Sequence, residues 1–261
     1  MKILVECGEH GPLKKALKIL KKYDLEISET PDVLFSIGGD GTYIRNYKDK
    51  KFKTPILPIR TPGSLGYIAD IDIEDLDRAC EKLADKKFYI EKRTMLDVYK
   101  NERKMGTAIN DVTITQTPTG AMWYRVDFYA YPLFDRAIII GDGVTVATPT
   151  GSTGYNKSEG GYILKPDSKK IVATLRHPFS LGPKEKRSKI LDNDSTIVFQ
   201  FYRPERALLI IDNESSSIRS SDYIFIRKSD ETFDFVRIRG MEESRRLKER
   251  RRTEWFEKQL F

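Results

Sequence analysis

The hydrophobic pattern of this 261-residue chain changes near Phe88, and no other feature limits its possible folds as strongly. Up to that point, apolar runs such as "KILVE" and "DVLFSI" alternate with segments of helical periodicity. Beyond it, almost every apolar run is short, rich in β-branched and aromatic residues, and bounded by turn residues. The pattern predicts an α/β domain with a parallel sheet, followed by a β-rich, β-sandwich-like domain.

Two segments before Phe88 predict amphipathic helices, "GPLKKALKILKKYD" and "IEDLDRACEKLADKKF". Their inward faces are expected to consist of Leu13, Ala16, Leu17 and Leu20 in the first helix, and of Leu76, Ala79, Cys80 and Leu83 in the second. Strands separated by such helices usually pair in parallel, and ligands usually bind at the carboxyl edge of a parallel sheet. We therefore expect a ligand site in the loops of this edge.

The last segment, "EESRRLKERRRTEWFEKQLF", combines apolar and aromatic residues with many charges. It predicts a C-terminal helix that packs back on the first domain and exposes its arginines to solvent. The chain is therefore expected to consist of residues 1–90, 91–240 and 241–261.

Composition narrows the functional classes. Hydrophobic residues make up 39% of the chain, enough for sizeable cores, and a formal charge of +7 suits a protein that handles phosphates. Cys7 and Cys80 are too few for a disulfide framework, and no apolar run approaches the roughly 20 residues of a membrane span. We expect a soluble, cytoplasmic protein that binds neither membranes nor nucleic acid.

The segment "SIGGDGTYIRNY" follows an apolar strand with Gly38, Gly39, Asp40 and Gly41. Glycines let a backbone come close to a ligand, so successive N–H groups can face phosphate oxygens. A carboxylate in such a loop is suited to bind a metal ion or to accept the proton of an attacking hydroxyl. On these residues alone, a tight surface turn fits equally well.

Two later segments also suit a polar ligand. In "DGVTVATPTGSTGYNKSEGG", residues 142–161, a β run ends in turns rich in Gly, Ser and Thr, although such segments also serve as linkers. In "NDVTI", Asn110 offers an amide that can bind an adenine edge, and Asp111 a carboxylate that can accept hydrogen bonds from ribose hydroxyls. An Asx turn that opens a strand is the simpler interpretation of this pair.

In this order and at these separations, the three segments resemble the NAD kinase family, and "TPTGST" is the most specific of them. The resemblance is strong from Val33 to Gly161 and looser toward the C-terminus. It implies an α/β domain that carries the phosphate-donor loop, a β-rich domain that binds NAD, and phosphorylation of the 2′-hydroxyl of the adenosine ribose to give NADP. It also implies ATP or polyphosphate as the donor, a divalent ion such as Mg²⁺ or Mn²⁺, and a homo-oligomer, either a dimer or a tetramer.

The resemblance assigns roles to individual residues. Asp40 is expected to be the catalytic residue that activates the ribose hydroxyl, and Gly38 and Gly39 are expected to contact the phosphate donor. From its place one turn past this loop, Arg45 is also expected to contact the donor, although a solvent-facing arginine fits equally well. The residues expected to bind NAD are Gly39, Gly41, Tyr67, Asn110, Asp111, Asp142, Thr153, Gly154, Tyr155 and Ser158. The sequence does not identify metal ligands.

Some positions depart from the family pattern. Asp111 stands where Glu is usual, Gly154 where Ala is usual, and Tyr67, in "GSLGY", where Phe is usual. The run "IDNESSS" stands where a turn of Asp-Gly-Glu type is common, and Asn213 is a residue that can adopt the left-handed conformation there. Because Asp40 is retained, we expect the chain to be active.

Three alternatives remain open. A lipid or sugar kinase is possible because diacylglycerol kinases and phosphofructokinases carry similar Gly-Gly-Asp-Gly loops. A pyridine-nucleotide-binding sensor without turnover would keep the same polar segments. A nucleic-acid-binding protein rests only on the basic charge and the C-terminal arginines, and it predicts a steep salt dependence of binding.

Overall fold

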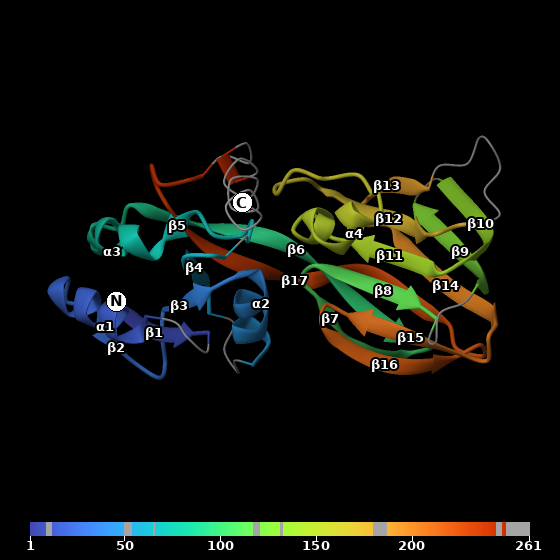
Figure 1. Ribbon diagram of the computed structural model, residues 1–261, viewed down its shortest axis with the longest axis horizontal. Coiled ribbons are helices and arrows are strands. Elements are labelled where there is room, and N and C mark those ends of the chain that lie inside the picture. Colours follow the sequence, from blue (N-terminus) through green and yellow to red (C-terminus); the bar gives the residue numbers. More distant parts are fainter. Residues whose placement is uncertain are drawn as a thin grey trace, which may run out of the picture. The chain divides into compact units, whose positions relative to one another are not determined.

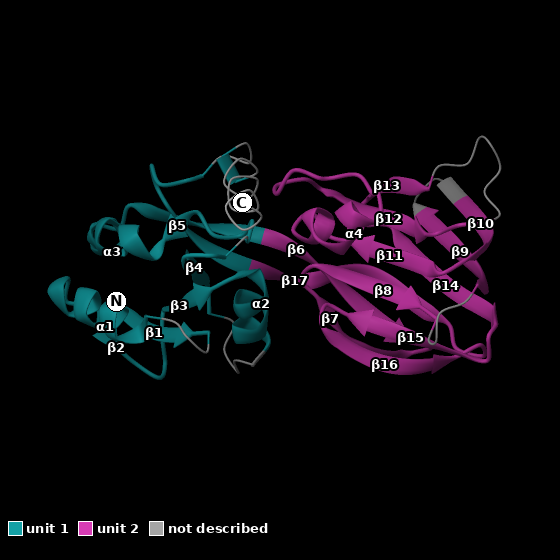
Figure 2. Ribbon diagram, viewed as in Figure 1, with its two compact units in different colours: residues 1–92, 234–261 teal, residues 93–233 magenta. Residues whose placement is uncertain are grey.

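The computed structural model describes residues 1–8, 12–49, 54–64, 66–116, 121–130, 133–179, 187–243 and 247–248. The chain forms two compact units, residues 1–92 with 234–261 and residues 93–233 (Figure 2). Two long strands, β6 (Phe88–Lys100) and β17 (Ile224–Ile238), contribute residues to both units. The end of β17, which the sequence led us to place in the β-rich domain, clusters with the first unit because Phe235 pairs with Ile56 there.

The first unit contains a parallel sheet flanked by helices (Figure 1). Its elements are β1 (Lys2–Cys7), α1 (Leu13–Lys22), β2 (Glu26–Ile27), β3 (Val33–Gly38), α2 (Asp40–Asp49), β4 (Ile56–Arg60), β5 (Ile71–Asp72), the 3-10 helix η1 (Ile73–Asp75) and α3 (Leu76–Ala84). Strand β1 pairs with β2 and β3, and β4 pairs with β3, β5 and β17, all in parallel. The predicted α/β domain with a parallel sheet is confirmed.

The helices cover both faces of this sheet. Because side chains alternate along a strand, Phe35 of β3 faces the cluster that includes α1 and α3, whereas Ser36 faces α2. There the amide of Asn46 donates a hydrogen bond of 2.9 Å to the Ser36 hydroxyl. The predicted inward face of α3 is buried, but Leu13 of α1 is 41% exposed. As the first residue of α1, Leu13 points its side chain away from the packed turns that follow, since helical side chains lean toward the N-terminus.

The second unit is built from two sheets. Besides β6 and β17 its elements are β7 (Arg103–Ala108), β8 (Asp111–Thr115), β9 (Met122–Ala130), β10 (Leu133–Gly141), β11 (Gly143–Ala147), the 3-10 helix η2 (Gly151–Thr153), α4 (Tyr155–Ser158), β12 (Lys170–Arg176), β13 (Ser188–Asp192), β14 (Thr196–Arg203), β15 (Arg206–Ile211) and β16 (Glu214–Arg219). One sheet has the order β13-β12-β11-β8-β15-β16, and the other contains β10-β9-β14-β17 with β6 and β7.

A single apolar cluster fills the space between these sheets. Val112 and Val146 enter it from the first sheet, and Tyr124 and Phe199 enter it from the second, where their rings stack with centroids 5.2 Å apart. Both sheets thus bury one face against the other, as the alternating pattern requires. The predicted β-rich, sandwich-like domain is confirmed.

The predicted C-terminal helix lies outside the described residues, apart from Leu247 and Lys248. The described part of the chain has no helix that is long and apolar enough to cross a bilayer.

Candidate active site

Asp40 is the first residue of α2, and it directly follows Gly38, the last residue of β3, and Gly39. Its carboxylate is held by two backbone amides from a distant loop, because Tyr67 N donates to Oδ2 at 2.8 Å and Ile68 N donates to Oδ1 at 3.0 Å. Each carboxylate oxygen can accept a further hydrogen bond. The side chain is therefore fixed in orientation while keeping room to receive a proton.

Gly66 allows this close approach. A Cβ atom at Gly66 would lie 2.3 Å from Oδ1 of Asp40 and 3.2 Å from its backbone N, so any larger residue would push the carboxylate away. The sequence indicated this loop through "GSLGY" but not the role of its second glycine.

The environment of Asp40 changes its proton affinity. Burial raises the pKa of the Asp40 carboxyl above its ordinary value. The amides of Tyr67 and Ile68, and the positive charges of Lys248 and Arg60, oppose that rise in pKa. A carboxylate whose pKa is raised is a stronger base than an ordinary aspartate, which suits the activation of a hydroxyl.

The expected phosphate loop lies at the start of α2, where Tyr43 joins it to β3. Tyr43 is fully buried and donates a hydrogen bond of 2.6 Å to the carbonyl of Gly38, which ties the helix to the end of β3. A Cβ atom at Gly41 would meet nothing within 4 Å, so this side of the loop is open. Arg45 is exposed on α2. The N-terminus of a helix of this length favours anions.

In the second unit, Asp212 organises the predicted Asn110–Asp111 pair. Its carboxylate accepts hydrogen bonds from the backbone N of Ile109 at 3.0 Å, of Asn110 at 2.7 Å and of Asp111 at 3.2 Å. Asp212 itself has a φ of +54°. The left-handed residue of this turn is therefore Asp212, whose side chain reaches the amides, and not Asn213, which the sequence offered for that conformation.

The "TPTGST" loop packs directly on this pair. Thr148 N donates to the carbonyl of Asn110 at 2.9 Å, and the Thr148 hydroxyl donates to that of Ile109 at 2.7 Å. A Cβ atom at Gly151 would lie 2.1 Å from the Asn110 carbonyl oxygen. The structure thus brings two of the three segments singled out in the sequence into contact.

Asn156, which the sequence did not single out, holds the rest of this loop. Its fully buried amide donates to the carbonyls of Ser152 at 3.0 Å and Tyr162 at 2.8 Å, and it accepts a hydrogen bond of 2.6 Å from the Thr174 hydroxyl. A buried amide with its hydrogen bonds made rigidifies the segment that it joins. A conformation of this kind suits a preformed binding loop better than a linker.

The position of Asp111 affects its charge. Only 3% of the residue is exposed. Burial, together with the negative charges of Asp212 and Glu159, raises the pKa of Asp111 to about 7. At neutral pH this carboxyl group can therefore donate or accept a hydrogen bond.

The remaining expected residues of the second unit lie in two places. Thr153, Gly154, Tyr155 and Ser158 belong to η2, α4 and the turn between them, and Tyr155 is 64% exposed. Asp142, in contrast, precedes β11, whose other end, at Ala147, pairs with Asp111. Five residues of extended strand span about 17 Å, so the structure does not bring Asp142 to the others within this unit. Asp142 forms an ion pair of 3.0 Å with His177 instead.

Among the described residues, no three His, Cys, Asp or Glu side chains converge as ligands of a metal ion. Mg²⁺ commonly binds through substrate phosphates with only one or two carboxylates. The described residues therefore do not form a protein cage for a metal ion.

Comparison with solved structures identifies the fold. The crystal structure of an NAD kinase from Archaeoglobus fulgidus in complex with ATP superposes with a TM-score of 0.80 at 23% identity, covering 96% of this chain and 99% of that one. The chain therefore has the fold of that NAD kinase.

Sequence relatives make the assignment specific. Residues 109–238 match the family model described as the ATP-NAD kinase C-terminal domain. The NAD kinase of Sulfurimonas denitrificans is 38% identical over 187 residues, 70% of this chain and 63% of that protein, which is less than two thirds of its length. The NAD kinase of Christiangramia forsetii is 31% identical over 225 residues, 82% of this chain and 74% of that protein. The chain belongs to the NAD kinase family.

Proposed function

We propose that this chain phosphorylates the 2′-hydroxyl of the adenosine ribose of NAD to give NADP, with Asp40 as the general base. The observation that carries the proposal is the Asp40 carboxylate at the start of α2, directly after two glycines, oriented by two amides at 2.8 and 3.0 Å and with its pKa raised by burial.

The chemical step is a transfer of one phosphoryl group. The 2′-oxygen attacks the terminal phosphorus of the donor, the bond from that phosphorus to its bridging oxygen breaks, and the hydroxyl proton passes to Asp40. Phosphoryl transfer needs a positioned nucleophile and neutralisation of charge more than covalent help from the protein. The two amides hold the orientation of the base, and the nearby positive charges of Lys248 and Arg60 favour its ionised form.

The donor is proposed to be ATP, with polyphosphate as the alternative, and its phosphates to lie near Gly38, Gly39 and Arg45. The Archaeoglobus fulgidus NAD kinase was crystallised with ATP, which supports this choice. A divalent ion is proposed to arrive on the donor phosphates, so removal of metal ions with EDTA should abolish turnover but leave NAD binding intact.

The second unit is proposed to bind NAD through Asn110, Asp111 and the loop that carries Thr153, Gly154, Tyr155 and Ser158. The support is the packing of this loop on the Asn110 carbonyl and the rigid anchor that Asn156 provides. Gly39, Gly41 and Tyr67 are proposed contacts from the first unit. Asp142 lies at the far end of β11 and is not part of this group within the unit.

The test is NADP formation from NAD with purified protein, Mg²⁺ and either ATP or polyphosphate, with Asp40→Asn measured in parallel. We expect the native chain to form NADP and Asp40→Asn to be slower by about 10²–10⁴-fold, the usual contribution of a general base, with NAD affinity retained. Asp77→Asn is a matched control, because the Asp77 carboxylate also accepts hydrogen bonds from two residues, but from the side chains of Lys22 and Tyr23 at the surface. It should stay within twofold of the native rate.

Other outcomes would favour the alternatives. NAD binding without NADP formation by the native chain would favour a sensor. Transfer of phosphate to diacylglycerol or a sugar, but not to NAD, would favour another kinase.

A further inference from the structure

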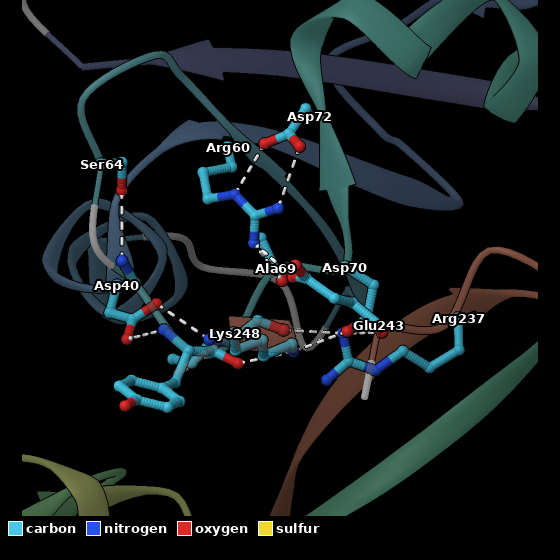
Figure 3. A network of polar contacts seen from close by, with 12 residues as sticks. Asp40, Arg60, Ser64, Ala69, Asp70, Asp72, Arg237, Glu243 and Lys248 are labelled. Carbon is cyan, nitrogen blue, oxygen red and sulfur yellow. Dashed lines mark hydrogen bonds and ion pairs between the residues drawn. The ribbon is translucent and has the colours of Figure 1, made fainter. Parts of the chain in front are cut away.

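Three cationic side chains of the first unit are nearly inaccessible to solvent. Arg60 is 2% exposed, Arg237 is 4% exposed and Lys248 is 7% exposed. Burying a charge costs free energy unless it is paired and hydrogen-bonded. All three lie around the loop that precedes β5, residues 66–70 (Figure 3).

Each cation donates to a different carbonyl of this loop. Lys248 Nζ donates to the Tyr67 carbonyl at 2.7 Å, Arg237 Nη1 to the Ile68 carbonyl at 2.8 Å, and Arg60 Nη1 to the Ala69 carbonyl at 2.9 Å. Three consecutive carbonyl groups are thus bound by three different cationic side chains. The amides of Tyr67 and Ile68 are used differently, because they donate to the Asp40 carboxylate.

Carboxylates fix the cations in turn. Asp70 forms ion pairs with Lys248 at 2.6 Å and with Arg237 at 3.0 Å. Arg60 is held by Asp72 at 2.6 Å and by Glu243 at 2.8 Å. Arg237 is also paired with a residue of β6, Glu91, at 2.6 Å. Because each cationic side chain is held by at least one carboxylate, the position from which it donates to the loop is fixed.

We propose that Lys248, Arg60 and Arg237 are positioning residues for Asp40, which hold the carbonyls of residues 67–69 so that the amides of Tyr67 and Ile68 orient the carboxylate. Lys248 gives the segment after β17 a direct part in the arrangement, although it follows Asp40 by most of the length of the chain. The inference rests on the proposed role of Asp40 as the general base.

The loop needs to be held because the reaction rate is sensitive to the position of the catalytic group. An error of about 1 Å in the position of a catalytic group can cost about 100-fold in rate. A loop without regular secondary structure would let its amides move by such amounts, whereas carbonyls bound to buried cations cannot turn without breaking charge-assisted hydrogen bonds. Lys248 and Arg60 are the charged groups that favour ionised Asp40, so the same cations also support its basic form.

The first test is Lys248→Met, which keeps the length of the side chain and removes its charge and donors. We expect kcat for NADP formation to fall about tenfold or more, and the KM for NAD to change less than about threefold. The acid limb of the kcat profile should move to higher pH, because Asp40 loses a positive charge that favours its ionised form. Lys248→Arg keeps the charge and the donors, so it should restore most of kcat and the position of the acid limb.

Lys82→Met is the matched control. Lys82 also donates from Nζ to a carbonyl of the first unit, but this carbonyl, at 2.9 Å, belongs to Arg239 and not to the loop of residues 66–70. It should leave kcat and the acid limb unchanged. Asp70 keeps its ion pair with Arg237 in Lys248→Met, so this variant is expected to fold.

Gly66→Ala tests the contact between the loop and the Asp40 carboxylate by changing the loop instead of a cation. The new methyl group would lie 2.3 Å from Oδ1 of Asp40. We expect kcat to fall about tenfold or more with NAD affinity retained. This variant also decides the question if Lys248→Met does not fold.

The inference is overturned if folded Lys248→Met keeps the native kcat and acid limb, or if Gly66→Ala keeps the native kcat. A different result would contradict the proposed role of Asp40 as the general base, because Asp40→Asn would then keep its activity. If Asp40→Asn is inactive while both other variants are fully active, Asp40 is the base but the loop does not position it.

Discussion

The Asp40 group and the Asn110–Asp111 group are held in place by different kinds of contact. Around Asp40, the loop of residues 66–70 is bound by three buried cations and their acidic partners. Around Asn110, the contacts are hydroxyl and amide hydrogen bonds and close backbone packing, with Asp212 as the carboxylate that accepts from the turn. The first arrangement sets the charge and orientation of one carboxylate, whereas the second sets the shape of a loop.

This difference predicts which variants should change the reaction rate and which should change the stability of the fold. When Lys248 is replaced, Asp70 keeps its ion pair with Arg237, so we expect the loss of this cation to appear mainly in kcat. Close backbone packing around Asn110 leaves no room to adjust, so its disturbance should appear first in the free energy of unfolding.

The largest expected effect on stability comes from Gly151→Ala. A Cβ atom there would lie 2.1 Å from the Asn110 carbonyl oxygen, which belongs to the backbone and cannot rotate away. We expect the free energy of unfolding to fall by about 3 kcal/mol, at the upper end of the usual cost of overpacking, as measured by urea denaturation.

Gly106→Ala serves as its control in the same unit. There the nearest atom to a new Cβ, at 3.3 Å, is a terminal methyl group of Ile211 that can shift, so the loss should stay below about 1 kcal/mol. Equal losses for the two variants would contradict the distinction between backbone and side-chain obstacles.

The next effect in size comes from Asp212→Asn. The substitution keeps a residue that tolerates the left-handed conformation but removes the charge that three backbone amides share. Hydrogen bonds to charged groups contribute about 1.5–3 kcal/mol, so we expect a loss of about 2 kcal/mol in urea denaturation and a weaker affinity for NAD.

Asp192→Asn provides a surface comparison. Its ion pair with Lys170 is exposed, so it should change the free energy of unfolding by less than about 0.5 kcal/mol. A native-like stability of Asp212→Asn would show that the Asn110–Asp111 turn does not need this carboxylate.

The third prediction concerns pH and Asp111. In the folded chain its pKa is raised to about 7 from an ordinary value of 3.8, so between these values the folded chain holds a proton that the unfolded chain has lost. Stability contributed by this group is therefore present at low pH and is lost as the pH rises toward 7. Between pH 5 and 7 the native chain should lose about 2 kcal/mol relative to Asp111→Asn.

The measurement is urea denaturation of both proteins at several pH values. Asp212→Asn should reduce the dependence, because it removes one of the negative charges that raise the pKa of Asp111. Parallel stability curves for the native chain and Asp111→Asn would show that Asp111 titrates normally.

The smallest effect on stability is expected for Ser158→Ala. Its exposed hydroxyl donates only to the Tyr155 carbonyl, at 2.7 Å, within the short helix α4, so the free energy of unfolding should change by less than about 0.5 kcal/mol. If Ser158 contacts NAD as proposed, the KM for NAD should rise about fivefold, the value of one hydrogen bond. An unchanged KM would remove Ser158 from the proposed contacts.

The sequence alone determined the fold class and the identity of the key segments. Hydrophobic periodicity predicted the parallel α/β unit and the sandwich, because burial of one face imposes the period on each element. It did not predict α2, whose residues Asp40–Asp49 show little amphipathic pattern and are held by tertiary contacts such as that of Tyr43 with Gly38.

Only the tertiary structure decided how these segments are held. The amides that bind Asp40 belong to residues 27 and 28 positions after it in the sequence. Lys248, which donates to the Tyr67 carbonyl, follows Tyr67 by 181 positions. Asp212 likewise caps a turn 102 residues before it at Asn110. Proton affinity and orientation depend on the charges and donors within a few ångströms of a group. Sequence patterns record only neighbours along the chain, so they named Asp40 and Asp111 but not the residues that set their chemistry.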